Sequence, residues 1–340
     1  MKRREFLKSM ASMAMGPFFY NTENENKSVK ITFGGDVCLS SPQRKPTYDN
    51  FESIMENLKN KEGNKAVYSY CFNEMQGIFN NSDLVMVNLE CPITESNDIL
   101  VKKFNFRANP DYVNILKIAG IDVVTLANNH IMDFSSKGVE DTIDLLDGVD
   151  IGYVGAGMNF ERARIPKILN IKGFDFGFLG YSMIGPSSIF ASNSKAGTVN
   201  LDKKIYCEDI IELKKQVDFL IVNVHWGIER DFYPTDYQKY HGRTFIDYGA
   251  DVVIGHHPHV IQPIEKYKDG LIFYSLGNFM FGGNSTRSLN SITETFTPTI
   301  SFSSQSINYY ISPIRITSRE KPYQPFEHNN PERIFKLLSV

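Results

Sequence analysis

Short apolar runs, each followed at once by a polar residue able to bind a metal, constrain this chain more than any other sequence feature. They are Lys30–Asp36, Asp83–Glu90, Ile121–Leu126, Asp218–His225 and Asp251–Gly255. Each run is long enough for one buried strand. Segments with helical spacing lie between and after them: Tyr112–Ala119, Ser135–Leu146, Glu208–Gln216 and Asp236–Tyr248. Strands that alternate with helices predict an α/β fold with right-handed crossovers and a largely parallel sheet.

Two predicted hairpins make the sheet system mixed. Ile165–Ile171 and Phe174–Tyr181 flank a Lys172-Gly173 turn, and Val260–Tyr267 and Leu271–Leu276 flank Lys268-Asp269-Gly270. We therefore expect mixed β-sheets packed between helices. The polar, Ser/Thr-rich stretch Ser285–Gln305 predicts a mobile loop before a last strand at Ile307–Ile316.

The two ends of the chain differ from its centre. Arg3 and Arg4 precede Phe6 and a short apolar stretch, as in a twin-arginine export signal; the alternative is a disordered basic tail. We predict a signal and linker at 1–27, one domain at 28–317 and a C-terminal tail at 318–340, whose His328 has no assigned role. An exported protein, periplasmic or on the cell surface, follows, with the signal either removed or kept as a membrane anchor. No later run reaches the ~20 apolar residues of a membrane span.

The composition bears on two questions: whether the chain binds nucleic acid, and whether its cysteines form disulfides. The formal net charge is −3 and the pI is about 6.2, so no basic field favours nucleic acid. The four cysteines are even in number but sparse and irregularly spaced for a disulfide framework. We expect Cys38, Cys71, Cys91 and Cys207 to be mostly buried and reduced.

The polar residues after the strands predict one site, because sites of α/β proteins lie at the carboxyl ends of strands. They are Asp36, Glu90, Asn129 with His130 and Asp133, His225, and His257 with His259. Two histidines at i and i+2 of an extended segment point to the same side, and neutral imidazole is a common metal ligand. Buried carboxylates cost several kcal/mol unless a charge compensates them, and a dication would do so.

Each motif also has a purely structural explanation. The histidines at 257 and 259 fit a hydrogen-bonded surface turn, and Asn129 with Asp133 fits an Asx turn that caps the helix at Ser135. His225, beside the only tryptophan, fits a satisfied core residue. The convergence of all these motifs at strand ends favours a site for one or two divalent metal ions, Mn, Fe or Zn.

Six motifs follow one another along the chain: Gly-Gly-Asp36, Asn88-Leu89-Glu90, Asn129-His130 with Asp133, His225-Trp-Gly-Ile-Glu229, His257-Pro-His259 and Tyr274-Ser275-Leu276-Gly277-Asn278-Phe279. This ordered set resembles the CapA family, which is associated with bacterial capsule and poly-γ-glutamate synthesis. The likeness spans about Val29 to Phe281. The family's domain is similar to the calcineurin-like metallophosphatases, which implies a four-layer α/β sandwich.

The resemblance implies a role for each residue. Asp36, Glu90, Asn129, His225, His257 and His259 would bind metal, with Glu90 bridging; His130 would act as general acid or charge stabiliser, oriented by Asp133. Glu229, Tyr274, Ser275 and Asn278 would contact substrate or support the ligands. Arg107 is either a contact for an anionic substrate or a surface side chain lying over aromatic rings. Cys38 stands where the metallophosphatases have a histidine, and either binds metal as thiolate or packs as a small apolar group.

Several functions follow from this resemblance. The first is metal-assisted hydrolysis of a phosphoester. The second is work on an anionic envelope polymer, as an enzyme or assembly factor for capsule or poly-γ-glutamate. The third is a binding module within a membrane-bound synthase complex.

Overall fold

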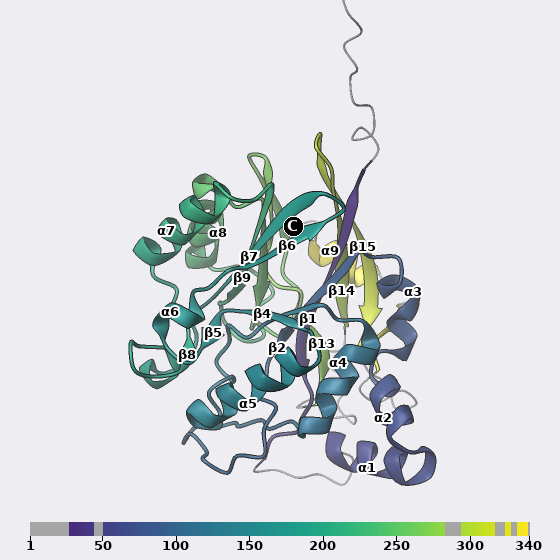
Figure 1. Cartoon of the computed structure of the whole chain (residues 1–340). Coiled ribbons are helices and arrows are strands. Elements are labelled where there is room, and N and C mark those ends of the chain that lie inside the picture. Colours follow the sequence, from purple (N-terminus) through teal and green to yellow (C-terminus); the bar gives the residue numbers. More distant parts are fainter. Residues whose placement is uncertain (1–26, 44–49, 283–293, 317–323, 328–331, 339–340) are drawn as a thin grey trace, which may run out of the picture.

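The computed structural model describes residues 27–43, 50–282, 294–316, 324–327 and 332–338. In these residues two β-sheets pack face to face, and helices cover the outer face of each (Figure 1). The predicted export signal and His328 lie outside the described residues. Among the described helices, none combines the length and the apolar character that crossing a bilayer requires.

The first sheet has eight strands, in the order β16-β15-β14-β1-β2-β3-β4, with β13 also paired to β1. The strands β1 to β4 and β13 run parallel, whereas β14, β15 and β16 are antiparallel to their neighbours. Their bounds are β1 Val29–Cys38, β2 Leu84–Leu89, β3 Val123–Thr125, β4 Gly152–Val154, β13 Asn278–Phe281, β14 Glu294–Phe302, β15 Ile307–Arg315 and β16 Phe326–Glu327.

The second sheet has six strands, in the order β11-β12-β10-β9-β7-β6. Its bounds are β6 Lys167–Ile171, β7 Phe174–Ser182, β9 Phe219–His225, β10 Val252–His256, β11 Ile264–Tyr267 and β12 Gly270–Phe273. The two predicted hairpins are confirmed, since β6 pairs antiparallel with β7 and β11 with β12, at opposite edges. A small separate sheet joins β5 (Ala156–Gly157) to β8 (Gly197–Thr198).

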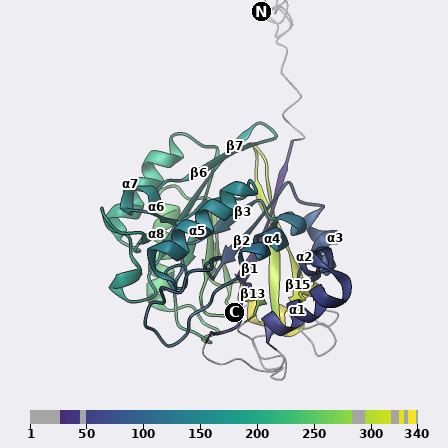
Figure 2. The same cartoon turned by 60° about the horizontal axis from the view of Figure 1, so that its bottom comes forward.

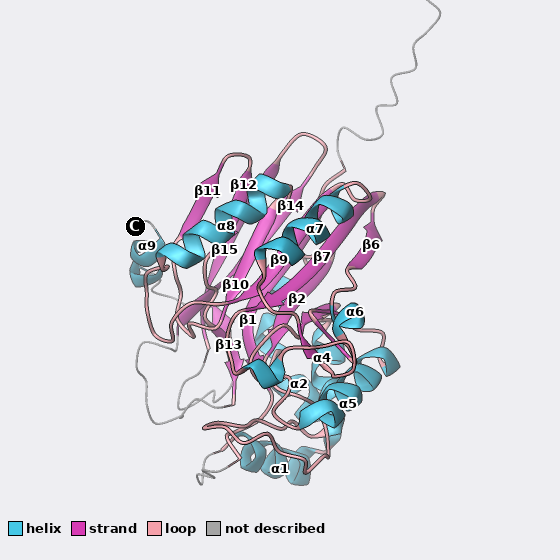
Figure 3. Cartoon of the chain, turned by 90° about the vertical axis from the view of Figure 1, so that its left-hand side faces the viewer, coloured by secondary structure: helices cyan, strands magenta, loops and turns pink. Residues whose placement is uncertain are grey.

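Helices form the two outer layers. The first sheet is covered by α1 Phe51–Glu62, α2 Asn64–Tyr70, α3 Gln76–Phe79, α4 Val113–Ala119 and α5 Ser135–Gly148 (Figure 2). The second is covered by α7 Lys203–Lys214 and α8 Asp236–Tyr248 (Figure 3). The short α6 (Phe160–Ala163) and α9 (Glu332–Leu338) complete the described helices, beside short 3₁₀ turns at Asn73–Met75, Pro110–Tyr112 and Ser187–Ile189.

Three apolar clusters fill the three interfaces between these four layers. Side chains alternate along a strand, so Phe219 and Ile221 face the first sheet, while Leu220 and Val222 face α7 and α8. Strands covered on both faces are apolar throughout, which explains the continuous runs in the sequence. The predicted fold class, mixed sheets packed between helices, is confirmed.

The predicted mobile loop at Ser285–Gln305 was wrong for its second half. Residues 294–302 form β14, which pairs with both β1 and β15. Thr295, Thr297 and Thr299 are fully buried there, and the Thr299 hydroxyl lies 2.6 Å from that of Thr32. Threonine is polar but β-branched, so it favours strands when its hydroxyl finds a partner.

Parts of the segment predicted as a C-terminal tail pack on the first sheet. Phe326 pairs with Arg315 of β15, and Ile334 of α9 is fully buried in the cluster between the sheets. The described residues beyond 317 therefore contribute to the core.

The contact between α7 and α8 contains a buried histidine. Thr235 and Gln238 form a capping box that begins α8. One turn later, His241 is buried, with Nδ1 2.7 Å from the Tyr206 hydroxyl of α7. Burial lowers the pKa of His241 to about 4, and the Lys203 charge contributes.

We predict that His241 makes the fold sensitive to acid. The unfolded chain binds a proton near pH 6.5, whereas the folded chain resists protonation down to about pH 4. The free energy of unfolding should therefore fall as pH drops from about 6.5 to about 4. Urea unfolding across this window should show a shallower fall for His241→Gln than for the parent chain. Equal slopes would contradict the assignment.

Candidate metal centre

The predicted ligands lie together where the carboxyl ends of the two sheets meet. Asp36 is near the end of β1, Glu90 follows β2, Asn129 follows β3, His225 ends β9, and His257 follows β10. The Nε2 atom of His225 lies 2.9 Å from Oδ1 of Asn129 and 3.6 Å from Oε1 of Glu90. The first sheet thus supplies carboxylates and an amide, and the second supplies imidazoles.

Two overlapping groups have the spacing of a metal site. One is Asp36, Glu90 and His225; the other is Glu90, His257 and His259. Within each group, one ligand atom per residue lies within 4.8 Å of the others. Glu90 belongs to both, so this geometry suits a bridging carboxylate between two cations.

Unpaired polar atoms provide an independent test of fit. Among the described residues, Oε1 of Glu90 and Nδ1 of His257 are buried without a hydrogen-bond partner. Burying such atoms unpaired costs roughly 1–3 kcal/mol each. Carboxylate, amide and imidazole donors suit Mn, Fe or Zn. The residues present fit a divalent cation.

The acidic residues of the cluster have strongly shifted pKa values. Burial opposes ionisation of Asp36, yet the neighbouring imidazoles of His256 and His259 hold its pKa well below the usual range. Burial, followed by the negative charge of Asp36, raises the pKa of Glu90. Two buried carboxylates this close therefore need added positive charge before both can ionise.

The histidines divide into neutral and charged forms. Burial lowers the pKa of His225, and that of His257 to about 3, so both rings stay neutral and keep a lone pair. Burial also disfavours the charge on His259, but Glu90 and Asp36 outweigh it and raise its pKa to about 9. Without a cation, a proton on His259 compensates the carboxylates.

The backbone at the paired histidines differs from the prediction. An extended segment was expected to aim both rings to one side, but φ is +99° at His257 and +57° at His259. Such angles are uncommon for residues other than glycine and store strain that the surroundings must support. The rings still converge, with centroids 5.9 Å apart and His257 4.8 Å from His225.

Two buried asparagines hold the carboxylates and the loop after β3. Asn88 donates from Nδ2 to Oδ1 of Asp36 at 2.8 Å. Asn128 donates to Oδ1 of Asn88 at 3.0 Å, and its own Oδ1 accepts from the backbone N–H of His130. Asn88 stands in one of the motifs and Asn128 directly precedes another, but no local pattern separates these supports from the ligands.

His130 belongs to a buried polar network beside the cluster. Its Nδ1 lies 2.9 Å from Oδ2 of Asp133, and Asp133 also pairs with the Lys102 ammonium. Lys102 further donates to the backbone oxygen of Asn129 at 2.6 Å. Burial lowers the pKa of His130, against the charge of Asp133. Lys102 carried no sequence signal, because it lies between Val101 and Lys103 in a segment that belongs to none of the motifs.

His256 is a further residue that the sequence analysis left without a role. It is buried, and its Nδ1 lies 3.2 Å from Oδ1 of Asp36. Asn278, a predicted supporting residue, accepts at Oδ1 from Nδ1 of His259 over 2.7 Å. A hydrogen bond of this kind fixes the ring orientation of a metal-binding histidine.

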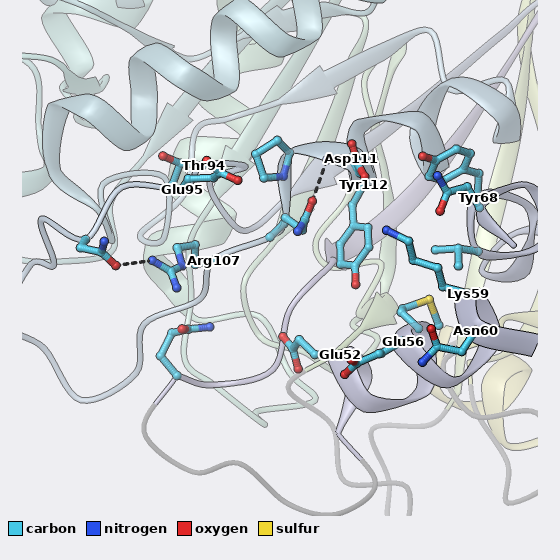
Figure 4. A pocket seen from close by; sticks show the side chains of 18 residues that line it. Glu52, Glu56, Lys59, Asn60, Tyr68, Thr94, Glu95, Arg107, Asp111 and Tyr112 are labelled. Carbon is cyan, nitrogen blue, oxygen red and sulfur yellow. Dashed lines mark hydrogen bonds between the residues drawn. The ribbon is translucent and has the colours of Figure 1, made fainter.

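Other predicted contacts lie outside the cluster. Glu229 is exposed. Tyr274 is buried beneath α8, with its hydroxyl donating to Glu265 at 2.5 Å, and Ser275 donates to the backbone oxygen of Val260. Arg107 stacks over the Phe134 ring at 5.2 Å and lines a pocket beside α1 (Figure 4). Tyr274 and Ser275 thus lie in the core, and their contact with substrate or with the ligands stays a prediction.

The cysteines are free and buried, as predicted. Cys38 packs in the cluster between the first sheet and its helices, and burial raises the pKa of its thiol. The candidate ligand groups found among the described residues do not include it. This placement favours the packing interpretation.

The fold and the site define an α/β protein with a buried cluster of candidate metal ligands between two mixed sheets. The family model described as "Bacterial capsule synthesis protein PGA_cap" matches residues 30–283, and the chain belongs to this family.

Two curated relatives are similar over most of this chain. It is 31% identical over 275 residues to "Capsule biosynthesis protein CapA" of Bacillus anthracis, covering 78% of this chain and 63% of that one. It is 34% identical over 241 residues to "PGA biosynthesis protein CapA" of Bacillus subtilis (strain 168), covering 70% and 62%. The chain thus spans less than two thirds of either relative's length.

A distant likeness also exists to a solved structure, "Structure of Haemophilus influenzae NAD nucleotidase (NadN)". Its TM-score is 0.46 at 12% identity, covering 91% of this chain and 61% of that one. A likeness at this level bears on no functional question.

We predict that the purified protein binds stoichiometric Mn, Fe or Zn and that His257→Ala combined with His259→Ala removes most of it. The two substitutions delete two of the three ligands in one group. Elemental analysis by mass spectrometry measures the content, and His241→Gln, at the contact of α7 and α8 and outside both ligand groups, is the control. Equal metal in the double variant and the parent would exclude the site.

Proposed function

We propose that this chain is an exported, metal-dependent hydrolase that acts in capsule or poly-γ-glutamate metabolism on a phosphoester or a polymer linkage. The observation that carries the proposal is the His130–Asp133 pair beside a buried cluster of carboxylates and neutral imidazoles. Membership of the capsule synthesis family and the relatives' names support the process. Export rests on the paired arginines at the amino end.

The cluster would hold one or two divalent cations. Asp36, Glu90, Asn129 and His225 would form one set of ligands, and Glu90, His257 and His259 the other. When bound, such a cation supplies hydroxide at neutral pH and polarises the phosphoryl or carbonyl oxygen under attack.

In this proposal, His130 transfers the proton to the leaving group. Asp133 pairs with Lys102 and accepts from the backbone N–H of Phe106 at 2.7 Å, which fixes its carboxyl group beside His130. Nδ1 of His130 lies 2.9 Å from the Asp133 carboxyl group, which accepts, and 3.2 Å from the Lys102 ammonium, which donates; the proposed role requires the form in which Nδ1 donates to Asp133. Nε2 is then the atom that must take up a second proton, and the resulting imidazolium would give that proton to a leaving group.

Two observations favour a second candidate, a weakly catalytic or non-catalytic component of a membrane-bound synthase complex. One is that Cys38 packs in the core where the metallophosphatases have a histidine. The other is the name of a relative from Mycobacterium tuberculosis, "Probable polyglutamine synthesis accessory protein Rv0574c", 26% identical over 279 residues. In this alternative, the anionic polymer or the synthase is a binding partner.

We predict slow hydrolysis of bis(p-nitrophenyl) phosphate in the presence of Mn²⁺, with kcat about 10²- to 10⁴-fold lower in His130→Ala. The substitution removes the proton donor but none of the grouped candidate ligands. Metal content is measured in parallel and should match the parent. Unchanged kcat in the variant would exclude His130 as the acid, and a fully metal-loaded but inactive parent would favour the second candidate.

A further inference from the structure

A closed loop, Glu95–Arg107, follows β2 along the chain and contains no helix or strand. Its two ends lie side by side, since the Thr94 backbone N–H donates to the Ala108 oxygen at 3.1 Å. Loops whose ends are close and whose side chains pack within the loop are frequently functional. This loop packs on the candidate metal centre, because the ring of Phe106 lies 4.7 Å from that of His130.

Hydrogen bonds within the loop fix its shape. Asn105 donates from Nδ2 to the Leu100 backbone oxygen at 2.8 Å, and Arg107 donates from Nη1 to the Ser96 backbone oxygen at the same distance. A loop that is held in this way presents its side chains in defined positions.

Lys102 carries a positive charge from this loop to the candidate metal centre. Its neighbours Val101 and Lys103 are exposed, whereas the Lys102 side chain is mostly buried. The Lys102 ammonium pairs with Oδ1 of Asp133 and donates to the Asn129 backbone oxygen at 2.6 Å. One cation thus contacts two residues that belong to a single motif of the site.

The two oxygens of Asp133 have different partners. Oδ2 lies 2.9 Å from Nδ1 of His130 and accepts from the Phe106 backbone N–H at 2.7 Å, whereas Oδ1 faces Lys102. Asp133 is fully buried, so removal of the ammonium would leave Oδ1 in the interior without a charged partner. The carboxyl group would then lose one of the contacts that fix its orientation toward His130.

The same ammonium holds the backbone at a candidate metal ligand. The oxygen that Lys102 contacts belongs to Asn129, whose side-chain Oδ1 lies 2.9 Å from Nε2 of His225. Loss of a residue that orients metal ligands typically weakens metal binding or activity by about 10- to 100-fold. Lys102 therefore supports both the ligand Asn129 and the His130–Asp133 pair.

We propose that Lys102 is a positioning residue for both halves of this site and that the loop Glu95–Arg107 serves to place it. Lys102 orients Asn129 toward the cation and Asp133 toward His130, and it acts through these residues without touching the substrate. Its effect on metal binding is independent of hydrolysis, whereas its effect on turnover rests on the proposed function.

Titration with Mn²⁺, followed by the electron paramagnetic resonance signal of the free ion, tests the role in metal binding. Lys102→Met removes the charge but keeps an unbranched side chain, and it should weaken Mn²⁺ binding about tenfold. Lys103→Met is the matched control, because Lys103 is exposed and lies over the Phe104 ring at 5.1 Å, and its affinity should equal that of the parent. Equal affinity in Lys102→Met and the parent would overturn the proposal.

Turnover of bis(p-nitrophenyl) phosphate at saturating Mn²⁺ tests the role toward His130. In Lys102→Met, kcat should fall about tenfold with KM nearly unchanged, because Lys102 does not touch the substrate. In a His130→Ala background, the same substitution should change kcat less than about threefold, since its effect passes through His130. An equal loss of kcat with and without His130 would contradict this role.

Two further variants separate the charge of Lys102 from its packing. Lys102→Arg keeps a cation and should bind Mn²⁺ more tightly than Lys102→Met, and equal weakening of both would count against the proposal. Lys102→Gln is polar but uncharged, and it takes the place of Lys102→Met in both comparisons should that variant not fold. A parent chain that binds Mn²⁺ without turnover would refute the proposed hydrolase, and the Mn²⁺ affinities would still decide the role of Lys102.

Discussion

The two buried carboxylates Asp36 and Glu90 require compensating charge and hydrogen bonds, and the rest of the site is arranged around that requirement. Both are fully buried, and burial of a negative charge without a partner costs several kcal/mol. The protein surrounds them with histidines and with the amide of Asn88, yet an oxygen of Glu90 still lacks a partner among the described residues. Protons on His259 and Glu90 relieve the charge only in part, and a divalent cation relieves it more fully.

This arrangement depends on the contact between the two sheets. Asp36 and Glu90 come from the first sheet, whereas His225, His256 and His257 come from the second. The apolar cluster between the sheets therefore fixes the distance between the carboxylates and the imidazoles. Close backbone contacts help: a side chain at Gly35 would place its Cβ 2.0 Å from the backbone oxygen of Gly277. The opposed strand ends and the tight glycine contact together bring the ligands into one site.

The sequence predicted the strands that carry the ligands better than the loops that aim them. An apolar run ends where the chain leaves the sheet, so Asp36, Glu90 and His225 were recognisable from local pattern. Helix α8 was predicted with the bounds that the structure shows, whereas α7 begins earlier than expected because Asp202 caps it. The pattern predicted no helix over Phe51–Glu62, although Asn50 and Gly63 cap that segment.

What the sequence left open depends on contacts between distant segments. His256 lies beside Asp36, and Lys102 pairs with Asp133. The partners are far apart in the sequence, so no local periodicity predicts either contact. The positive φ angles of His257 and His259 likewise depend on the surrounding fold and not on residue type. The strand β14 was missed because buried threonines resemble a polar loop until their partners across the sheet are known.

The central claim is that Asp36, Glu90 and the histidines of the second sheet share a cation. Anomalous X-ray diffraction from crystals grown with Mn²⁺ tests it most directly, because the signal locates the ion without reference to activity. The account predicts at least one peak within about 2.5 Å of a Glu90 oxygen, with His225 or His257 as a further ligand. A peak only at distant surface carboxylates, with none between the sheets, would contradict it.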